Sequence, residues 1–335
     1  MEQQILSKIK EYLKNATINT ECNMGEVQKV DFLAQGEYNR NFFISDNLGQ
    51  NFVFRINYGS QINQAKQARY EFQALNMLFP SGRTPKPLLL DDSKQYFDHD
   101  ILIEQFLPGR PLIYERDLSQ AAEIFGDVHR LTLDDHQISQ LITETNICSD
   151  RINEAKSLLE TVFQSNKVDK DGKKILTTLF NWCNNHVDDQ YFSQQPQNIV
   201  NTEVNSNNFL ITDDYGYLID WEKPVYSNSV QDLTQFLAKT TTLWRTDTIL
   251  SQKQVDQFLL YYSRLVERSY EEVKESVISY MPFLLLRALS WCAMLITTYD
   301  EKPIQNEEIY LRSKMYLTID FAKPLLKEYG VNIDG

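Results

Sequence analysis

The chain has 335 residues, with 33 Lys and Arg against 46 Asp and Glu, so its formal net charge is −13. This acidic balance argues against a general nucleic-acid-binding protein, because binding to phosphate backbones needs basic surface. The length is typical of two domains or lobes, since one hydrophobic core seldom grows beyond about 250–300 residues.

The first hundred residues are predicted to be rich in strands. The expected elements are a helix over 1–15, strands over 27–33, 41–45 and 51–57, a helix over 61–79 and a strand over 101–107. In the third strand, Phe52, Phe54 and Ile56 alternate with other residues, which places them on one face. Pro80, Gly82, Pro85 and Pro87 are expected to break the chain after the helix.

The remainder of the chain is predicted to be mainly helical, with one short β island. The expected elements are helices over 118–131, 151–163 and 173–185, strands over 198–200, 208–212 and 217–220, and long helices over 229–240, 252–296 and 305–328. The pattern predicts an α+β protein with a small β-rich lobe over residues 1–104 and a larger helical lobe over 105–335.

Three features indicate a cytoplasmic protein that is not associated with a membrane. The four cysteines and four histidines lack the close spacing of a disulfide framework or a zinc site. The N-terminal segment has charges between Ile5, Ile9 and Leu13 and does not resemble a signal peptide. The most apolar stretch, 281–296, contains Pro282 and Arg287 and is too short to span a bilayer, so a buried helix is expected.

The β island holds the residues that could carry chemistry. The chain contains neither a GxxxxGK[ST] nor a GxGxxG motif, which disfavours P-loop NTPases and Rossmann enzymes. Glu203 lies five residues before Asn208, and Asp220 follows Asn208 by twelve residues. This spacing can gather three oxygen-bearing side chains at the end of a hairpin, and Mg²⁺ prefers such ligands. From the spacing alone, an ordinary hairpin with turn residues is the preferred interpretation.

The island also resembles a known catalytic region. Residues 200–222, which end in the sequence I-D-W-E, resemble the aminoglycoside phosphotransferase and choline kinase family, whose pattern is H-G-D-x-x-x-x-N followed by I-D-W/F-E. Six further segments resemble that family in the right order: LAQGEYNRNFFI (33–44), FVFRIN (52–57), YEFQALNML (70–78), ILIEQFLPGRPL (101–112), FGDVHRL (125–131) and VYSNSVQDLTQFL (225–237). Together they cover about residues 30 to 240 and imply a protein-kinase-like, two-lobe α+β fold.

The resemblance implies an ATP- and Mg²⁺-dependent phosphotransferase that moves the γ-phosphate to a hydroxyl of a small molecule. Arg55, held by Glu71, would bind the phosphates, and the backbone of 104–106 would bind the adenine edge. The implied site consists of Glu203 as the catalytic carboxylate, Gly36, Asn39, Arg55, Glu71, Glu104, Gln105 and Phe106 as nucleotide-binding residues, and Asn208 and Asp220 as Mg²⁺ ligands.

Several of these residues have a plainer interpretation. Arg55 could be a surface cation on an edge strand, and its pair with Glu71 an exposed ion pair that contributes little to stability. His129, at the end of a predicted helix, is expected to be structural. Trp221 and Trp291 could line a pocket, although aromatic residues at such positions are more often part of the core.

The sequence departs from the family pattern in the catalytic loop. The pattern's Asp is Glu203, its His is Asn201 and its Gly is Thr202. Glu203 keeps a carboxylate that can orient or deprotonate a hydroxyl. Its extra methylene displaces the charge, however, and a misplacement of about 1 Å can cost about 10²-fold in rate. The alternative function is therefore a kinase-like protein that binds a nucleotide or ligand without efficient transfer.

The acceptor remains open from the sequence. Aminoglycosides, choline, thiamine, a sugar and homoserine all fit a small hydroxylated substrate. Protein kinase activity is the least favoured alternative, because I-D-W-E replaces D-F-G and the sequence has no A-P-E-like segment. No nucleic-acid or membrane partner is expected, and the sequence does not indicate an oligomeric state.

Overall fold

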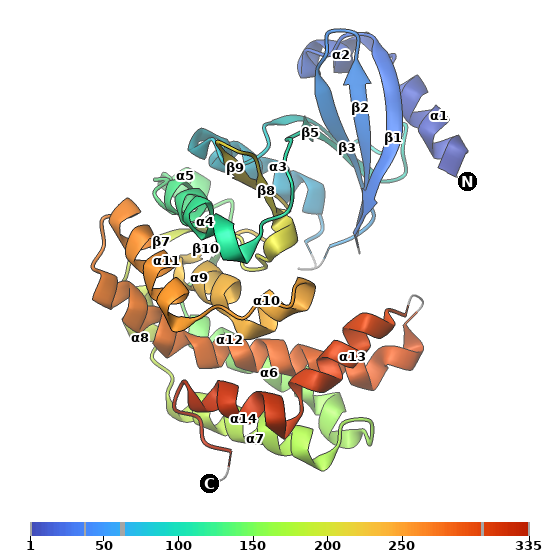
Figure 1. The fold of residues 1–335 in the computed structure, drawn as a ribbon. Helices are drawn as coiled ribbons and strands as arrows, with labels where there is room; N and C mark the ends of the chain where they lie inside the picture. Colours follow the sequence, from blue (N-terminus) through green and yellow to red (C-terminus); the bar gives the residue numbers. More distant parts are fainter. Residues whose placement is uncertain (1, 37, 61–63, 303–304, 334–335) are drawn as a thin grey trace. The chain divides into compact units, whose positions relative to one another are not determined.

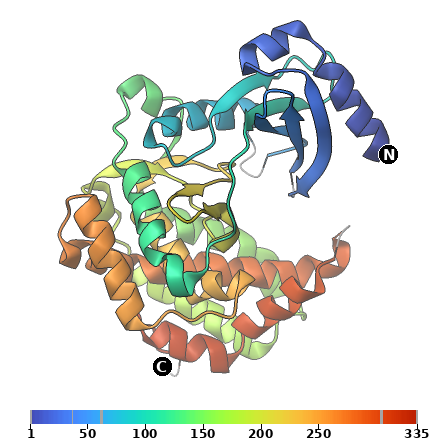
Figure 2. The same cartoon turned by 45° about the horizontal axis from the view of Figure 1, so that its top comes forward.

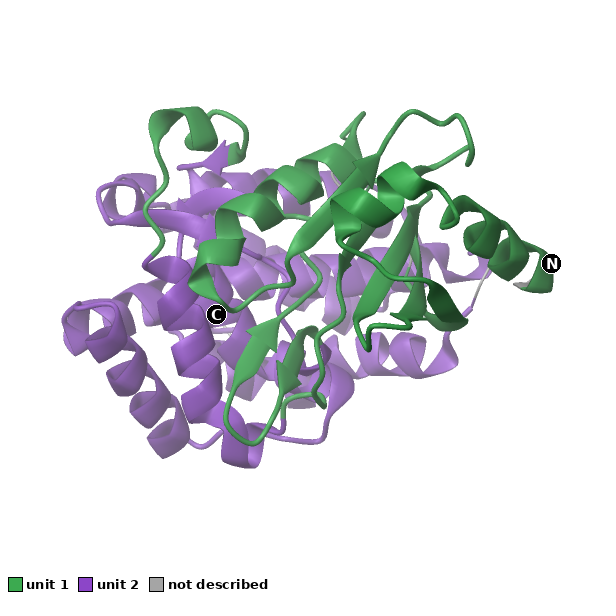
Figure 3. Ribbon diagram, turned by 90° about the horizontal axis from the view of Figure 1, so that it is seen from above, with its two compact units in different colours: residues 1–112, 131–142, 208–224 green, residues 113–130, 143–207, 225–335 purple. Residues whose placement is uncertain are grey.

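The computed structural model describes residues 2–36, 38–60, 64–302 and 305–333. The chain divides into two compact units, each made of three separate segments (Figure 3). Unit 1 comprises residues 1–112, 131–142 and 208–224, and unit 2 comprises residues 113–130, 143–207 and 225–335. Unit 1 thus includes three stretches that a division of the sequence after residue 104 assigns to the second lobe, namely 105–112, 131–142 and 208–224.

Unit 1 is built on a five-stranded antiparallel sheet with the strand order β1-β2-β3-β5-β4 (Figure 1). Its strands are β1 (Val27–Gln35), β2 (Asn39–Asp46), β3 (Asn51–Asn57), β4 (Pro87–Asp91) and β5 (Asp100–Gln105). Phe52, Phe54 and Ile56 are buried in one core, as their alternation predicts. Helices α1 (Glu2–Tyr12) and α2 (Ala16–Cys22) are the blue helices near the N-terminus in Figure 2. They contribute Ile9 and Ile18 to the same core.

The remaining elements of unit 1 include the hairpin of the β island. They are α3 (Gln67–Leu78), η1 (Phe79–Ser81), α5 (Asp135–Ile138), and the hairpin of β8 (Phe209–Ile211) and β9 (Gly216–Leu218). The segment after β5 is fixed to this hairpin by an antiparallel bridge between Arg110 and Ile211. Gly109 allows the close approach, since it has a φ of 146° and an added Cβ would lie 2.8 Å from the Leu210 carbonyl carbon.

Unit 2 is mainly helical and contains a three-stranded sheet with the order β6-β10-β7. The strands are β6 (Ile142–Glu144), β7 (Gln197–Val200) and β10 (Val225–Asn228). The helices are α4 (Tyr114–His129), α6 (Ile147–Gln164), α7 (Lys170–Asn185), α8 (Asp189–Ser193), η2 (Ser206–Asn208, at the boundary with unit 1), α9 (Val230–Leu237), α10 (Lys239–Arg245), α11 (Gln252–Leu265), α12 (Tyr270–Thr298), η3 (Tyr299–Glu301), α13 (Glu307–Tyr316) and α14 (Ile319–Lys327).

Helix α12 forms the centre of unit 2. It packs against α6, α7, α9, α11 and α13. Within the described part of the chain, the segment Tyr270–Glu301 is the one helical stretch long and apolar enough to cross a membrane, but 67% of its apolar window is buried inside the protein. This burial is typical of a core helix and confirms the buried helix expected over 281–296. The expectation that this stretch is too short to span a bilayer is wrong, because it belongs to the longer helix α12.

The predicted α+β class is confirmed, and several boundaries differ from the predictions. Strand β4 begins at Pro87, where a break was expected, because a proline is tolerated as the first residue of an edge strand. The helix expected over 252–296 is two helices, since Glu267 adopts a left-handed φ of 55° and Ser269 caps the next helix. The helix expected over 305–328 likewise divides where Thr318 caps α14. The helix expected over 61–79 begins at Gln67, and 61–63 lie outside the described residues.

Candidate active site

Arg55 lies at the centre of a buried group of charged side chains in unit 1. Its Nη1 is 2.5 Å from Glu71 Oε1 and 3.9 Å from Glu104 Oε1, and its Nη2 is 3.2 Å from Glu222 Oε1. Arg55 is 6% exposed and lies on β3, which runs between β2 and β5, and Glu71 on α3 is 2% exposed. The structure therefore contains the expected Arg55–Glu71 pair, and the alternative of an exposed pair on an edge strand is wrong.

The carboxylates of this group outnumber the cation. Burial acts to lower the pKa of Arg55, but Glu71, Glu104 and other carboxylates outweigh it and the pKa is raised. Burial raises the pKa of Glu71 to about 7 although Arg55 opposes the shift. Burial and the neighbouring Asp220 raise the pKa of Glu222 to about 7, and burial also raises the pKa of Glu104. Such an excess of negative charge favours the binding of a further cation nearby.

Two polar side chains hold Glu222 in this group. Asn39 Nδ2 donates to the Glu222 carboxylate, and Asn39 Oδ1 accepts a hydrogen bond of 2.9 Å from Asn57. Gln67 Nε2 donates to the Glu222 carbonyl oxygen over 2.6 Å. Asn39, which is expected to bind the nucleotide, is thus buried and positions the Glu222 carboxylate. Its contact with a nucleotide stays a prediction.

Gly36 closes a short turn before β2. Its N–H donates to the Asn39 carbonyl oxygen over 2.9 Å. Among the described residues other than its chain neighbours, the atom nearest to a Cβ at Gly36 would be that same oxygen, at 3.9 Å. The packing of these residues therefore does not require glycine here, and the approach of a phosphate stays the predicted reason for it.

The backbone at the end of β5, where an adenine contact is predicted, already uses two of its donors. The Gln105 N–H donates to the Lys86 carbonyl over 2.9 Å, and the Phe106 N–H donates to the Asn51 carbonyl over 3.1 Å. The Phe106 ring packs edge-on against Phe43 at 5.0 Å between ring centres. These two donors are used within the protein, and the contact of residues 104–106 with adenine stays a prediction.

Asn208 and Asp220 lie together at the end of the β8–β9 hairpin. Asn208 Nδ2 is 3.3 Å from Asp220 Oδ2, and the Ile219 N–H donates to the Asn208 carbonyl over 2.8 Å. Asp220 has a left-handed φ of 67°, a backbone conformation that Asp tolerates better than most residues. Trp221 is 1% exposed and donates to the Leu218 carbonyl, so it belongs to the core and does not line a pocket.

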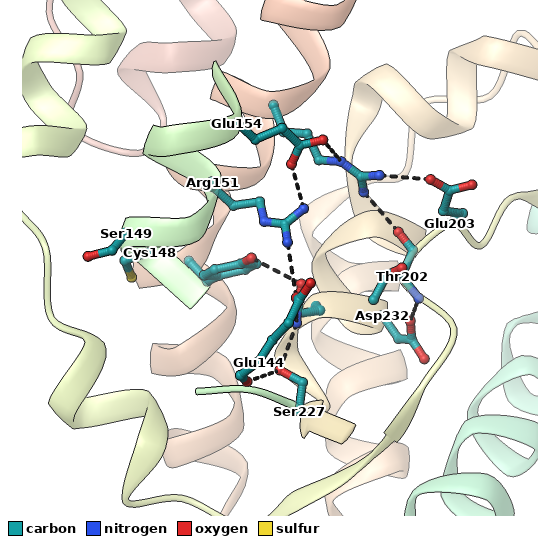
Figure 4. Close-up of polar contacts among 12 residues, drawn as sticks. Glu144, Cys148, Ser149, Arg151, Glu154, Thr202, Glu203, Ser227 and Asp232 are labelled. Atoms are coloured by element: carbon teal, nitrogen blue, oxygen red, sulfur yellow. Dashed lines mark hydrogen bonds and ion pairs between the residues drawn. The ribbon is translucent and has the colours of Figure 1, made fainter. Parts of the chain in front are cut away.

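The catalytic loop of the family pattern falls in unit 2, where the buried carboxylate of Asp232 anchors it. Asp232 Oδ2 accepts from the Asn201 N–H over 2.9 Å, and Asp232 Oδ1 accepts from the Thr202 N–H over 2.6 Å (Figure 4 shows the latter contact). His129 Nε2 lies 3.2 Å from Asp232 Oδ2, and its Nδ1 lies 2.9 Å from Tyr262 Oη. His129 is 3% exposed and has the structural role that was expected.

Glu203, the expected catalytic carboxylate, forms an ion pair that the sequence analysis missed. Arg287 Nη2 donates to Glu203 Oε1 over 2.8 Å, and Arg287 Nη1 donates to the Thr202 carbonyl over 3.0 Å. Arg287 stands on α12, 84 residues away along the chain, and no motif marks the pairing. The available signal was a lone arginine in an apolar segment, because a charge on a core helix needs a partner.

Thr202 is strained in a way that a substitution can test. Its φ is 67°, and left-handed backbone costs a non-glycine residue roughly 1–2 kcal/mol. We expect Thr202→Gly to have a free energy of unfolding about 1 kcal/mol higher than Thr202→Ala, because both lose the side chain but only Ala keeps the strain. Urea unfolding of the two variants measures the difference. A more stable Ala variant, the usual order in helices and strands, would contradict a left-handed Thr202.

Comparison with known proteins gives similarity in structure but not in sequence. No protein-family model matches the chain, and no curated protein matches it. A spectinomycin phosphotransferase, solved with ADP and spectinomycin, has a TM-score of 0.63 at 12% identity over 96% of this chain and 97% of its own. A putative aminoglycoside phosphotransferase from Ralstonia eutropha has a TM-score of 0.66 at 12% identity over 95% and 98%. An ethanolamine kinase from Plasmodium vivax has a TM-score of 0.60 at 13% identity over 95% and 88%.

These structures match nearly the whole chain at low identity, so they establish its fold. The architecture agrees with the order of strands and helices that the resemblance implies, including the β island that carries Asn208 and Asp220. The chain has the protein-kinase-like fold of the aminoglycoside phosphotransferase and choline kinase family.

Proposed function

We propose that this protein is an ATP- and Mg²⁺-dependent phosphotransferase that moves the γ-phosphate to a hydroxyl of a small molecule. The observation that carries the proposal is the buried pair of Arg55 on β3 and Glu71 on α3, together with Asp220 and Asn208 at the end of the hairpin in the same unit. Kinases of this fold need one cation for the phosphates and oxygen ligands for the metal, and these residues supply both.

The chemistry of the donor set fits Mg²⁺. Asp220 and Asn208 offer carboxylate and amide oxygens, and the neighbouring glutamates add negative charge. Among the described residues, no group of three or more His, Cys, Asp or Glu side chains is arranged to hold a metal. That arrangement is not required, because Mg²⁺ in kinases is usually bound by one or two protein side chains and by substrate phosphates. Asp220 and Asn208 would hold the ion, which would supply positive charge against the charge that develops on the phosphates.

We assign to Glu203 the binding and deprotonation of the acceptor hydroxyl. Its carboxylate is about one-third exposed, which suits a group that meets a substrate. The acceptor hydroxyl would donate a hydrogen bond to this carboxylate, which would orient the hydroxyl for attack and take up its proton. One similar structure is a spectinomycin phosphotransferase and another is an ethanolamine kinase, which makes aminoglycosides and small amino alcohols the first acceptors to screen by ADP release.

Mg·ATP is expected to raise the melting temperature by a few degrees, and Mg·ADP to do so as well. A ligand that binds only the folded state at about a hundred times its Kd adds roughly 2.7 kcal/mol of stability. Differential scanning fluorimetry with and without EDTA measures the metal-dependent part. A melting temperature that millimolar Mg·ATP leaves unchanged would contradict both the phosphotransferase and the nucleotide-binding alternative.

Asp220→Asn is the matched variant for this experiment. Asn adopts left-handed backbone about as readily as Asp and keeps an oxygen that can accept from Asn208. The melting temperature without ligand should therefore hold, while the Mg²⁺-dependent part of the stabilisation is lost. Early unfolding of the ligand-free variant would mean that Asp220 serves the hairpin and not a metal.

A further inference from the structure

Arg287 contacts the catalytic loop, at Thr202 and Glu203, through two nitrogens of its guanidinium group. Nη2 binds Glu203 Oε1 at 2.8 Å, Nη1 binds the Thr202 carbonyl oxygen at 3.0 Å, and Nε lies 3.4 Å from Glu154 Oε1 on α6. The side chain is 16% exposed. Figure 4 shows the Glu154, Thr202 and Glu203 ends of these contacts on three sides of one guanidinium.

A second layer of charged side chains, Arg151 and Glu144, fixes Glu154, the partner of Arg287 on α6. Arg151 Nη1 donates to Glu154 Oε2 over 2.7 Å, and its Nη2 donates to Glu144 Oε2 over 3.0 Å (Figure 4). Gln231 Nε2 also donates to Glu144 Oε2, over 3.0 Å. Arg151 is 4% exposed, so the cation that links Glu154 and Glu144 is buried in unit 2. Hydrogen bonds linked in this way limit one another's movement, and the planar guanidinium transmits that constraint.

The loop is therefore held from two elements. Asp232 on α9 binds the N–H groups of Asn201 and Thr202, whereas Arg287 on α12 binds the Thr202 carbonyl and the Glu203 carboxylate. A glutamate has one more rotatable bond than an aspartate and spreads over more positions when it is not held. A spread of about 1 Å is enough to cost about 10²-fold in rate.

We propose that Arg287 is a positioning residue, which fixes the Glu203 carboxylate and the strained Thr202 peptide in the geometry needed for phosphoryl transfer. Glu203 and Arg287 form a matched pair, in which the arginine gives the longer acid a defined position. This inference rests on the proposed function, because it assigns the acceptor to Glu203. Arg287 itself acts through Glu203 and touches no reacting atom.

The test compares Arg287→Gln and Arg287→Lys with the matched control Arg312→Gln. Arg312 on α13 also donates to a backbone carbonyl, of Thr246 at 3.3 Å, and pairs with Glu308 at 3.4 Å, and its side chain is 20% exposed. Three quantities are measured for each protein. The first is the steady-state rate of ADP release from Mg·ATP, as kcat and KM, both with water and with the screened acceptors. The second is the amide hydrogen exchange of residues 200–206, and the third is the melting temperature.

Arg287→Gln is expected to lower kcat by about 10-fold or more and to leave the KM for Mg·ATP within about twofold, because the nucleotide groups belong to unit 1. Exchange at residues 200–206 should become faster while the melting temperature changes little. Arg287→Lys should recover part of kcat, since it keeps the charge but not the planar fork. Arg312→Gln should match wild type in all three.

Two results would overturn the inference. One is wild-type kcat and loop exchange in Arg287→Gln, and the other is a fall in kcat that only follows a lower melting temperature and that Arg287→Lys does not relieve. If wild type releases no ADP with any acceptor, the proposed function fails by itself. Loop exchange then still decides whether Arg287 orders Thr202 and Glu203.

Discussion

Glu203→Gln is expected to lower the rate of ADP release by about 10²-fold or more, while the Kd for Mg·ATP stays the same. Glutamine has the same size as glutamate. Its amide oxygen can still accept the hydrogen bond from Arg287, which is 2.8 Å long in the wild-type protein. The substitution therefore removes the charge and the proton acceptor without moving the side chain. Steady-state ADP release with the best screened acceptor gives the rate, and a fluorescent ATP analogue gives the affinity.

Glu203→Asp separates an adapted enzyme from a weakened one. The variant keeps the carboxylate but shortens the side chain by one bond of about 1.5 Å, which moves it away from Arg287. In a site adapted to glutamate, the rate should fall between those of wild type and Glu203→Gln. A faster Glu203→Asp would favour the kinase-like protein with weak transfer. Equal rates in wild type and Glu203→Gln would contradict the catalytic assignment itself.

The parts of the site that local sequence could predict are those that a short motif carries. The resemblance of a strand and of the helix after it to the family implied Arg55 and Glu71, and the structure contains their pair at 2.5 Å. Glu222 is the last residue of I-D-W-E, but nothing in that motif shows that its side chain turns toward Arg55. Motifs give the order of residues along the chain, whereas side-chain direction depends on packing.

The pairing of Glu203 with Arg287 could not be predicted for a different reason. The two residues are separated by 84 positions, and their contact depends on how α12 packs against α6 and the loop. The fold shows the same limit. Alternating Phe52, Phe54 and Ile56 predicted β3 correctly, but the break between α11 and α12 depends on the left-handed backbone of Glu267, for which glutamate is not a typical residue.

Arg55→Gln is expected to lower the free energy of unfolding by about 3–5 kcal/mol at pH 8, because it leaves buried carboxylates without their cation. Glu71 and Glu222 have a folded-state pKa of about 7, above the ordinary 4.5, so the folded state binds protons that the unfolded state releases between these values. Their contribution to stability is therefore greatest below about pH 4.5 and is lost as the pH rises to 7. Arg55 lowers both pKa values, so its removal should make this decline steeper and the loss at pH 5 smaller than at pH 8.

Urea unfolding at pH 5 and pH 8 tests this expectation with two further variants. Arg69→Gln removes an arginine of unit 1 whose side chain is 45% exposed and whose pair with Asp92 lies at the surface, so the loss should stay below about 1 kcal/mol at both pH values. Glu71→Gln removes one titrating carboxyl and keeps Arg55 paired with Glu222, so stability should fall less between pH 5 and pH 8 than in wild type. The opposite changes in slope for Arg55→Gln and Glu71→Gln distinguish lost charge balance from lost packing, because a packing defect costs the same at either pH. An equal loss in Arg55→Gln at both pH values would mean that the carboxylates around Arg55 do not titrate as their burial indicates.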